Sequence, residues 1–184
     1  LDRRQRQMCI RDSYTIVQLS EENGTSWNNS VDAIYDWKPS KEEFLNVRMS
    51  FTDGMRDDRM DFEQDTLGVF GGKTPSMRYN THSYGDQWEF NGLADYTKKW
   101  GEATRLESGV KVIMRDDLDG FERFNTDINT GVTAIDSLSV NEFLYSENIF
   151  AAYTNYGFKK GKWGYQIGLR AEQANITATP VSYT

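Results

Sequence analysis

The sequence predicts an all-β protein, an antiparallel meander of about seven strands that forms part of a larger transmembrane β-barrel. Three observations predict this fold. Apolar and polar residues alternate over several segments, as they do in strands with two different faces. The connections between these segments alternate between short and long. Tyrosines and tryptophans gather beside the short connections, as expected of rings that lie at a membrane interface.

The composition excludes several classes of protein. The chain has 184 residues and a formal net charge of -7, and this acidic balance argues against nucleic acid as a partner. No stretch of about 18 apolar residues is present, so no transmembrane helix is expected. One cysteine excludes a disulfide framework, and one histidine excludes a metal site built on a histidine pair. The aromatic content of 14% argues against disorder.

The first thirteen residues differ from the rest of the chain. LDRRQRQMCIRDS contains four arginines and the only cysteine, and it has no pattern of period 2 or 3.6. It resembles the translated sequencing-adapter tail seen on many metagenomic reading frames, so residues 1–13 are predicted to be a non-native tail. The alternative is a basic N-terminal arm. Residues 14–184 are predicted to be a partial barrel domain, an internal fragment of something longer.

Alternation is the main evidence for strands. Five segments alternate between apolar and polar residues, namely 29–37, 43–52, 87–97, 105–115 and 163–172. Segment 143–158 is apolar at both odd and even positions, so the sequence does not decide which of its side chains lie on which face. The evidence for a shorter strand at 14–20 is weaker. No segment shows a convincing helical period.

The connections between these strands are sorted by length. Short ones lie at 38–41, 98–102 and 159–162, whereas long polar ones are predicted at 53–84 and 118–141, with a brief one at 21–26. In a meander, the short connections then fall on one edge and the long ones on the other. An outer-membrane barrel has short periplasmic turns and longer extracellular loops. A soluble sandwich has no reason to sort its loops in this way.

Aromatic residues beside the short connections are predicted to form a belt at the membrane interface. Phe51 and Trp88 would mark the opposite belt, because Trp88 and Tyr96 lie about 27 Å apart along a strand. The alternative is a soluble antiparallel sheet whose aromatic side chains fill a core. The predicted belt consists of Tyr35, Trp37, Tyr96, Trp100, Trp163 and Tyr165.

The polar face of the same strands carries both signs of charge. Charged side chains against lipid would each cost a few kcal/mol at mid-depth, so they are expected to face water or another protein. An interior with both signs suits a wide lumen, either aqueous or filled by a plug. The residues predicted to face the lumen are Asp36, Arg48, Glu89, Glu107, Lys111, Gln166 and Arg170.

A resemblance to a known family supports this interpretation. Residues 143–172, FLYSENIFAAYTNYGFKKGKWGYQIGLRAE, resemble the strand–turn–strand of the β-barrel domain of TonB-dependent receptors, within the outer-membrane β-barrel family. Segments 35–53 and 106–121 are similar to other hairpins and strands of these barrels, and together the resemblance covers most of 29–178. It implies a barrel of about 22 strands around a plug, of which this chain supplies about seven.

No catalytic constellation is found, and we expect no enzymatic activity, cofactor or metal site. His82 is interpreted as a solvated loop residue, since no Gly-x-Ser-x-Gly elbow accompanies it. Three residues of a predicted extracellular loop, Asp116, Asp117 and Asp119, are candidates for ligand binding. An EF-hand does not fit this cluster, because Arg115 and Thr126 stand where calcium ligands would be needed. Calcium held by several loops together stays an alternative.

The resemblance implies a function in transport. A TonB-dependent receptor in the outer membrane of a Gram-negative bacterium would import a bulky solute, such as an iron chelate, a cobalamin or a glycan. The implied partners are outer-membrane lipids, that small-molecule or glycan ligand, and a plug domain and TonB energy-coupling complex that this chain lacks. The alternatives are a small structural or adhesive outer-membrane β-barrel, and a soluble all-β binding module.

Overall fold

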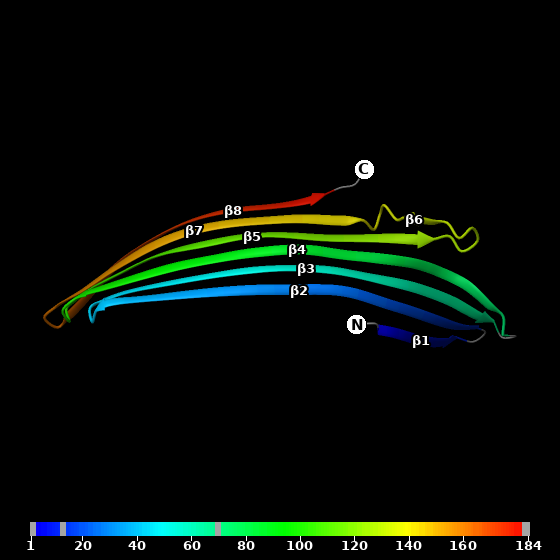
Figure 1. Ribbon diagram of the computed structural model, residues 1–184, viewed down its shortest axis with the longest axis horizontal. Coiled ribbons are helices and arrows are strands. Elements are labelled where there is room, and N and C mark those ends of the chain that lie inside the picture. Colours follow the sequence, from blue (N-terminus) through cyan, green and yellow to red (C-terminus); the bar gives the residue numbers. More distant parts are fainter. Residues whose placement is uncertain (1–2, 12–13, 69–70, 182–184) are drawn as a thin grey trace.

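The computed structural model describes residues 3–11, 14–68 and 71–181, so four residues of the predicted tail lie outside it. The described residues form one antiparallel sheet with the strand order β1-β2-β3-β4-β5-β7-β8, and β6 pairs with β5 (Figure 1). The all-β antiparallel meander is therefore confirmed. The strands are β1 (Arg3–Arg11), β2 (Tyr14–Ser40), β3 (Glu43–Gly68), β4 (Lys73–Trp100), β5 (Thr104–Thr126), β6 (Thr133–Ile135), β7 (Asn141–Lys160) and β8 (Trp163–Val181).

The strands are much longer than the sequence predicts. β2 joins the predicted strands 14–20 and 29–37 through the predicted connection 21–26, and β3 and β4 occupy most of the predicted loop 53–84. The prediction of long loops was wrong for a physical reason. Alternation reveals a strand only where one face is apolar, whereas the backbone ladder forms equally well where both faces are polar. Among the described residues after β5, the connection 127–140 is interrupted only by the short β6.

The short connections lie together at one end of the sheet, as predicted. Tight turns at 41–42, 101–103 and 161–162 join β2 to β3, β4 to β5 and β7 to β8, and all three are at the left in Figure 1. Gly101 and Gly161 both have φ of +65°, a conformation that favours glycine. The other end carries the β3–β4 junction and the segment that includes β6.

The described part of the chain has no apolar core. None of its large apolar side chains is buried, and the two buried polar residues are Asn46 and Asp65. A soluble single sheet would need a second layer to cover its apolar face. No second layer packs on this sheet within the described ranges, since its contacts all join strands that are neighbours in it. Nor do these ranges contain a helix with the length and apolar character needed to span a membrane.

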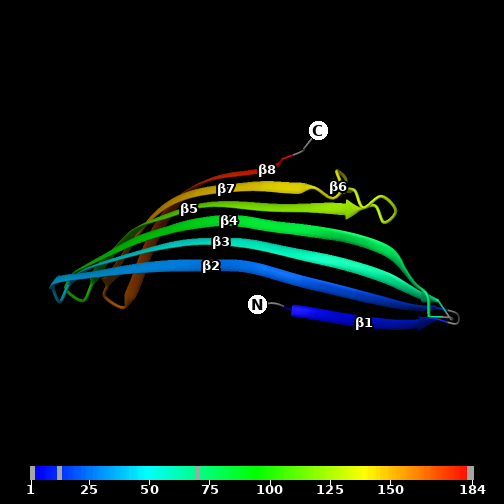
Figure 2. The same ribbon diagram turned by 45° about the vertical axis from the view of Figure 1, so that its right-hand side comes forward.

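The sheet is bowed and open at both sides (Figure 2). Within the described residues, β8 pairs only with β7, and residues 23–40 of β2 pair only with β3. In hydrocarbon every backbone donor and acceptor needs a partner, so a membrane sheet has to close. Within the described residues this sheet is not closed.

Residues 3–11 of the predicted non-native tail belong to the sheet. Residues 3–11 form β1, which pairs antiparallel with residues 14–22 of β2. Sequence periodicity gave no sign of this strand. Backbone pairing does not identify where a segment comes from, so the adapter origin of residues 1–13 stays a prediction.

Candidate functional site: two faces and a hollow

The strand register sorts the side chains onto two faces. Directly opposed residues of antiparallel strands share a face, so each continuous row of partners lies on one side of the sheet. The row of Ala94 runs from Tyr35 through Val47 and Ala94 to Val110, Ala152 and Ala171. The rows on either side of it on this face are also largely apolar, and many of their large side chains are exposed. The alternation of the separate segments thus joins into one apolar face.

The register also shows which face of the sheet the side chains of segment 143–158 lie on. Phe150 and Tyr156 of β7 oppose Val112 and Leu106 of β5, so they lie on the apolar face. Ile149 and Tyr153 lie on the other face, opposite Ile113 and Gly109.

All six residues of the predicted aromatic belt lie on the apolar face near the tight turns. Trp37 and Tyr96 share one row, and Trp100 and Tyr165 share another. Polar partners accompany them, because the Tyr96 hydroxyl and the Lys98 Nζ both donate to the Glu43 carboxylate. Rings with a hydrogen-bonding end suit the lipid headgroup level. That they contact lipid stays a prediction.

The apolar face ends at the row of Trp88. Asp53 and Asp116 flank Trp88 in this row, and charges of this kind do not belong in hydrocarbon. Trp88 and Trp100 are separated by about 40 Å along β4, or by about 30 Å across a membrane when the strand is tilted by roughly 40°. This matches the hydrocarbon thickness of about 30 Å. Strands of 19 to 28 residues exceed the 9–11 or so needed to span it, so their remaining length lies beyond the Trp88 row.

The seven residues predicted to face the lumen all lie on the face opposite the apolar one, and their contact with a lumen stays a prediction. One row of this polar face shows how its groups are satisfied. The Asn46 amide donates to Asp36 Oδ1 at 2.7 Å, and the Tyr153 hydroxyl donates to Asp95 Oδ1 at 2.6 Å. The Tyr153 side chain reaches Asp95 by crossing Gly109 of β5, where a Cβ would lie 2.4 Å from the tyrosine ring.

A cluster around Arg115 ties three strands together on the polar face. Its guanidinium lies 3.1 Å from Glu147 of β7, 3.4 Å from Asp117 of β5 and 3.8 Å from Glu89 of β4. It also lies 5.0 Å from the centre of the Tyr145 ring. The positive charge of Arg115 therefore offsets the mutual repulsion of these three carboxylates.

Arg115→Gln is expected to destabilise the assembled protein by about 2 kcal/mol, because it leaves three half-buried carboxylates without their shared cation. Urea unfolding of the full-length protein in lipid vesicles measures the loss. Lys111→Gln is the matched control, since Lys111 lies on the same strand and face and makes no ion pair in the described part of the chain. Equal losses for the two variants would contradict a specific role for the cluster.

A hollow of about 410 Å³ opens on the polar face just beyond the Trp88 row. Two neighbouring rows build it, and each row contains one glycine at a different strand, Gly54 in β3 and Gly85 in β4. Because glycine has no side chain, the backbone at these two positions forms the floor of the hollow, and polar groups form its walls. The first row consists of Asn28, Gly54, Gln87 and Asp117, and the second of Ser26, Arg56, Gly85 and Asp119.

The three predicted ligand residues are not in a loop and are not brought together. Asp116, Asp117 and Asp119 all lie on β5, with Asp116 on the face opposite to the other two. Asp117 and Asp119 line the hollow. Burial raises the pKa of Asp117, while the nearby Arg115 acts in the opposite direction. Within the described ranges no group of three or more His, Cys, Asp or Glu residues is arranged to hold a metal ion.

His82 is also on a strand rather than in a loop. It lies on β4 with its side chain 24% exposed, its Nε2 3.2 Å from Asp57 and its Nδ1 3.5 Å from Glu122. The neighbouring strands therefore enclose it between two carboxylates. The interpretation of His82 as a solvated loop residue was wrong, for the same reason that the loop 53–84 was.

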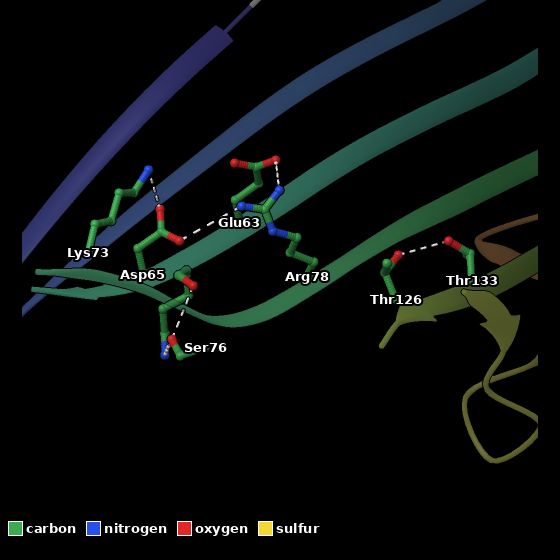
Figure 3. Close-up of polar contacts among 8 residues, drawn as sticks. Glu63, Asp65, Lys73, Ser76, Arg78, Thr126 and Thr133 are labelled. Atoms are coloured by element: carbon green, nitrogen blue, oxygen red, sulfur yellow. Dashed lines mark hydrogen bonds and ion pairs between the residues drawn. The ribbon is translucent and has the colours of Figure 1, made fainter. Parts of the chain in front are cut away.

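Ion pairs also hold the far end of the β3–β4 hairpin. Asp65 lies 2.7 Å from Lys73 and 3.8 Å from Arg78, and Arg78 donates to Glu63 at 2.9 Å (Figure 3). Ser76 lies where the register shifts, and its hydroxyl donates to the Gln64 carbonyl. Polar contacts thus take the place of apolar packing in this part of the sheet.

Comparison with known proteins identifies the family of the chain. The model of the outer membrane protein beta-barrel family matches residues 37–184, which is most of the chain. A search of curated proteins finds no match. The match begins in the last four residues of β2 and includes the strands from β3 to β8. The chain belongs to the outer membrane protein beta-barrel family and is a barrel protein of the outer membrane.

Proposed function

We propose that the chain is part of the barrel wall of a TonB-dependent receptor that imports a bulky solute across the outer membrane of a Gram-negative bacterium. One observation carries the proposal. Within the described residues, the seven strands in the main path of the sheet leave both sides open, which supports a larger barrel with a wide lumen. A wide lumen with charges of both signs on its wall accommodates a polar plug and a bulky solute.

The chain's own role in this proposal is passive. Its apolar face contacts outer-membrane lipids, and its polar face surrounds the plug. The strand ends beyond the Trp88 row meet the solute first. Energy coupling through TonB acts on the plug, and the chain performs no chemical reaction. The small structural or adhesive barrel stays the alternative.

Gene deletion in the source bacterium tests the proposal. Removal of the full-length gene should abolish the energised uptake of one class of solute, measured with iron chelates, cobalamin and oligosaccharides in turn. Removal of the TonB energy-coupling genes should abolish the same uptake. An unchanged uptake of all three classes in the first strain, with a weakened cell envelope instead, would favour the structural barrel.

A further inference from the structure

We infer that the hollow on the polar face of β2–β5 binds a neutral, hydroxylated solute, so that an oligosaccharide is the cargo of the proposed transport. This inference rests on the proposed function and narrows its three solute classes to one. The hollow lies on the face assigned to the lumen, immediately beyond the lipid-facing rows, where an incoming solute would pass.

The register explains why a hollow forms at this place. Gly54 and Gly85 stand diagonally to each other, and each is surrounded in its own row by residues with side chains. A Cβ on Gly54 would lie 3.1 Å from the Asn28 amide, and one on Gly85 would lie 2.9 Å from the Leu118 carbonyl. Side chains at these positions would therefore fill the hollow or push its walls apart.

The walls offer the hydrogen-bonding groups that hydroxyl groups need. The amides of Asn28 and Gln87 both donate and accept, the Asp117 carboxylate accepts, and the Arg56 guanidinium donates. Arg56 already lies 3.6 Å from Asp119, so its charge is largely balanced. A sugar hydroxyl both donates and accepts, so it can be matched by every one of these groups. The hollow's volume lies within the usual range for a small-molecule site.

Charge excludes anionic solutes from the same surface. Beyond the Trp88 row, the described residues outside the predicted non-native tail contain fourteen acidic and five basic residues, a formal net charge of -9. The four arginines of β1 would reduce this net charge to -5. A surface of this sign repels a polyanion as it approaches and does not repel a neutral molecule. Anionic iron chelates and acidic glycans are therefore poor candidates. Cobalamin is a rigid corrin macrocycle that is too large to enter a hollow of about 410 Å³, whereas one sugar ring of an oligosaccharide can enter it.

The test measures binding to the full-length protein in detergent, without energy coupling. An array of neutral oligosaccharides, a ferric tricatecholate chelate and cyanocobalamin are the probes. We expect a neutral oligosaccharide to bind, and Asp117→Asn to weaken it about tenfold, because a hydrogen bond to a charged group is lost. Asp116→Asn is the matched control, since Asp116 is the adjacent residue on the opposite face, and it should leave binding unchanged.

Other outcomes separate this inference from the proposed function. Binding of the chelate or cyanocobalamin alone, with coupled uptake of that probe in cells, would overturn the inference and keep the function. Oligosaccharide binding with uptake that needs no energy coupling would keep the inference and overturn the function. Equal weakening by Asp116→Asn and Asp117→Asn would show that the hollow is not the site. Gln87→Ala is a second variant of the hollow, and it should weaken binding even if Asp117→Asn fails to assemble.

Discussion

Ala152→Arg is expected to destabilise the assembled barrel by about 2–4 kcal/mol, the cost of arginine at the middle of the membrane. Ala152 lies on the apolar face, opposite Val110 and Ala171, midway between the rows of Trp88 and Trp100. A guanidinium there would meet hydrocarbon. The free energy of unfolding of the full-length protein in vesicles measures the effect, and the fraction that migrates as a folded barrel on a gel supports it.

Ala151→Arg is the matched control, because Ala151 is the same residue one position earlier on the opposite face. It lies between Lys111 and Glu172, so an arginine would meet water and a carboxylate. We expect a change below about 1 kcal/mol. Similar losses for Ala151→Arg and Ala152→Arg would mean that the two faces do not differ in environment, which would contradict the membrane assignment.

Gly109→Val should disturb the polar face by a different route. The Cβ of valine would lie 2.4 Å from both the Tyr153 ring and Asp95 Oδ1. Tyr153 would have to swing away, which breaks its hydrogen bond to Asp95. Overpacking and the lost bond together should destabilise the protein by about 3 kcal/mol, measured by the same unfolding experiment.

Gly164→Val provides the comparison for this glycine effect. Nothing lies within 4 Å of a Cβ at Gly164 of β8, and valine favours strands, so stability should stay the same or rise slightly. The double variant Gly109→Val with Tyr153→Ala should lose less than the sum of the two single losses, because the steric conflict is removed. Additive losses would show that Gly109 and Tyr153 are not coupled.

The sequence predicts the membrane part of this fold well because lipid requires alternation. Leu45, Val47 and Met49 can be assigned to one face without a structure, since a shift of one residue would expose all three to water. Beyond Trp88 this constraint ends. Segment 53–68 has polar residues on both faces, so its pairing with β2 and β4 leaves no periodic pattern in the sequence.

The candidate site was predicted only in part. Asp117 and Asp119 were among the predicted ligand residues, because carboxylates in a polar segment are candidates for ligand binding, and both line the hollow. Gly54, Gly85 and Gln87 were missed, because they lie in a segment interpreted as a loop. A hollow formed by glycines in neighbouring strands can be predicted only when the register of the strands is known. The register cannot be derived from a sequence that is polar on both faces.

A scan of accessibility along β5 tests the central claim most directly. Single cysteines placed in turn at residues 106–115 of the full-length protein, with Cys9 replaced, would carry spin labels in lipid bilayers. We predict a period of two, with Leu106, Val110 and Val112 accessible to oxygen dissolved in lipid, and Glu107, Lys111 and Arg115 accessible to a water-soluble relaxation agent. Equal access of the water-soluble agent to all ten positions would contradict a lipid-facing wall.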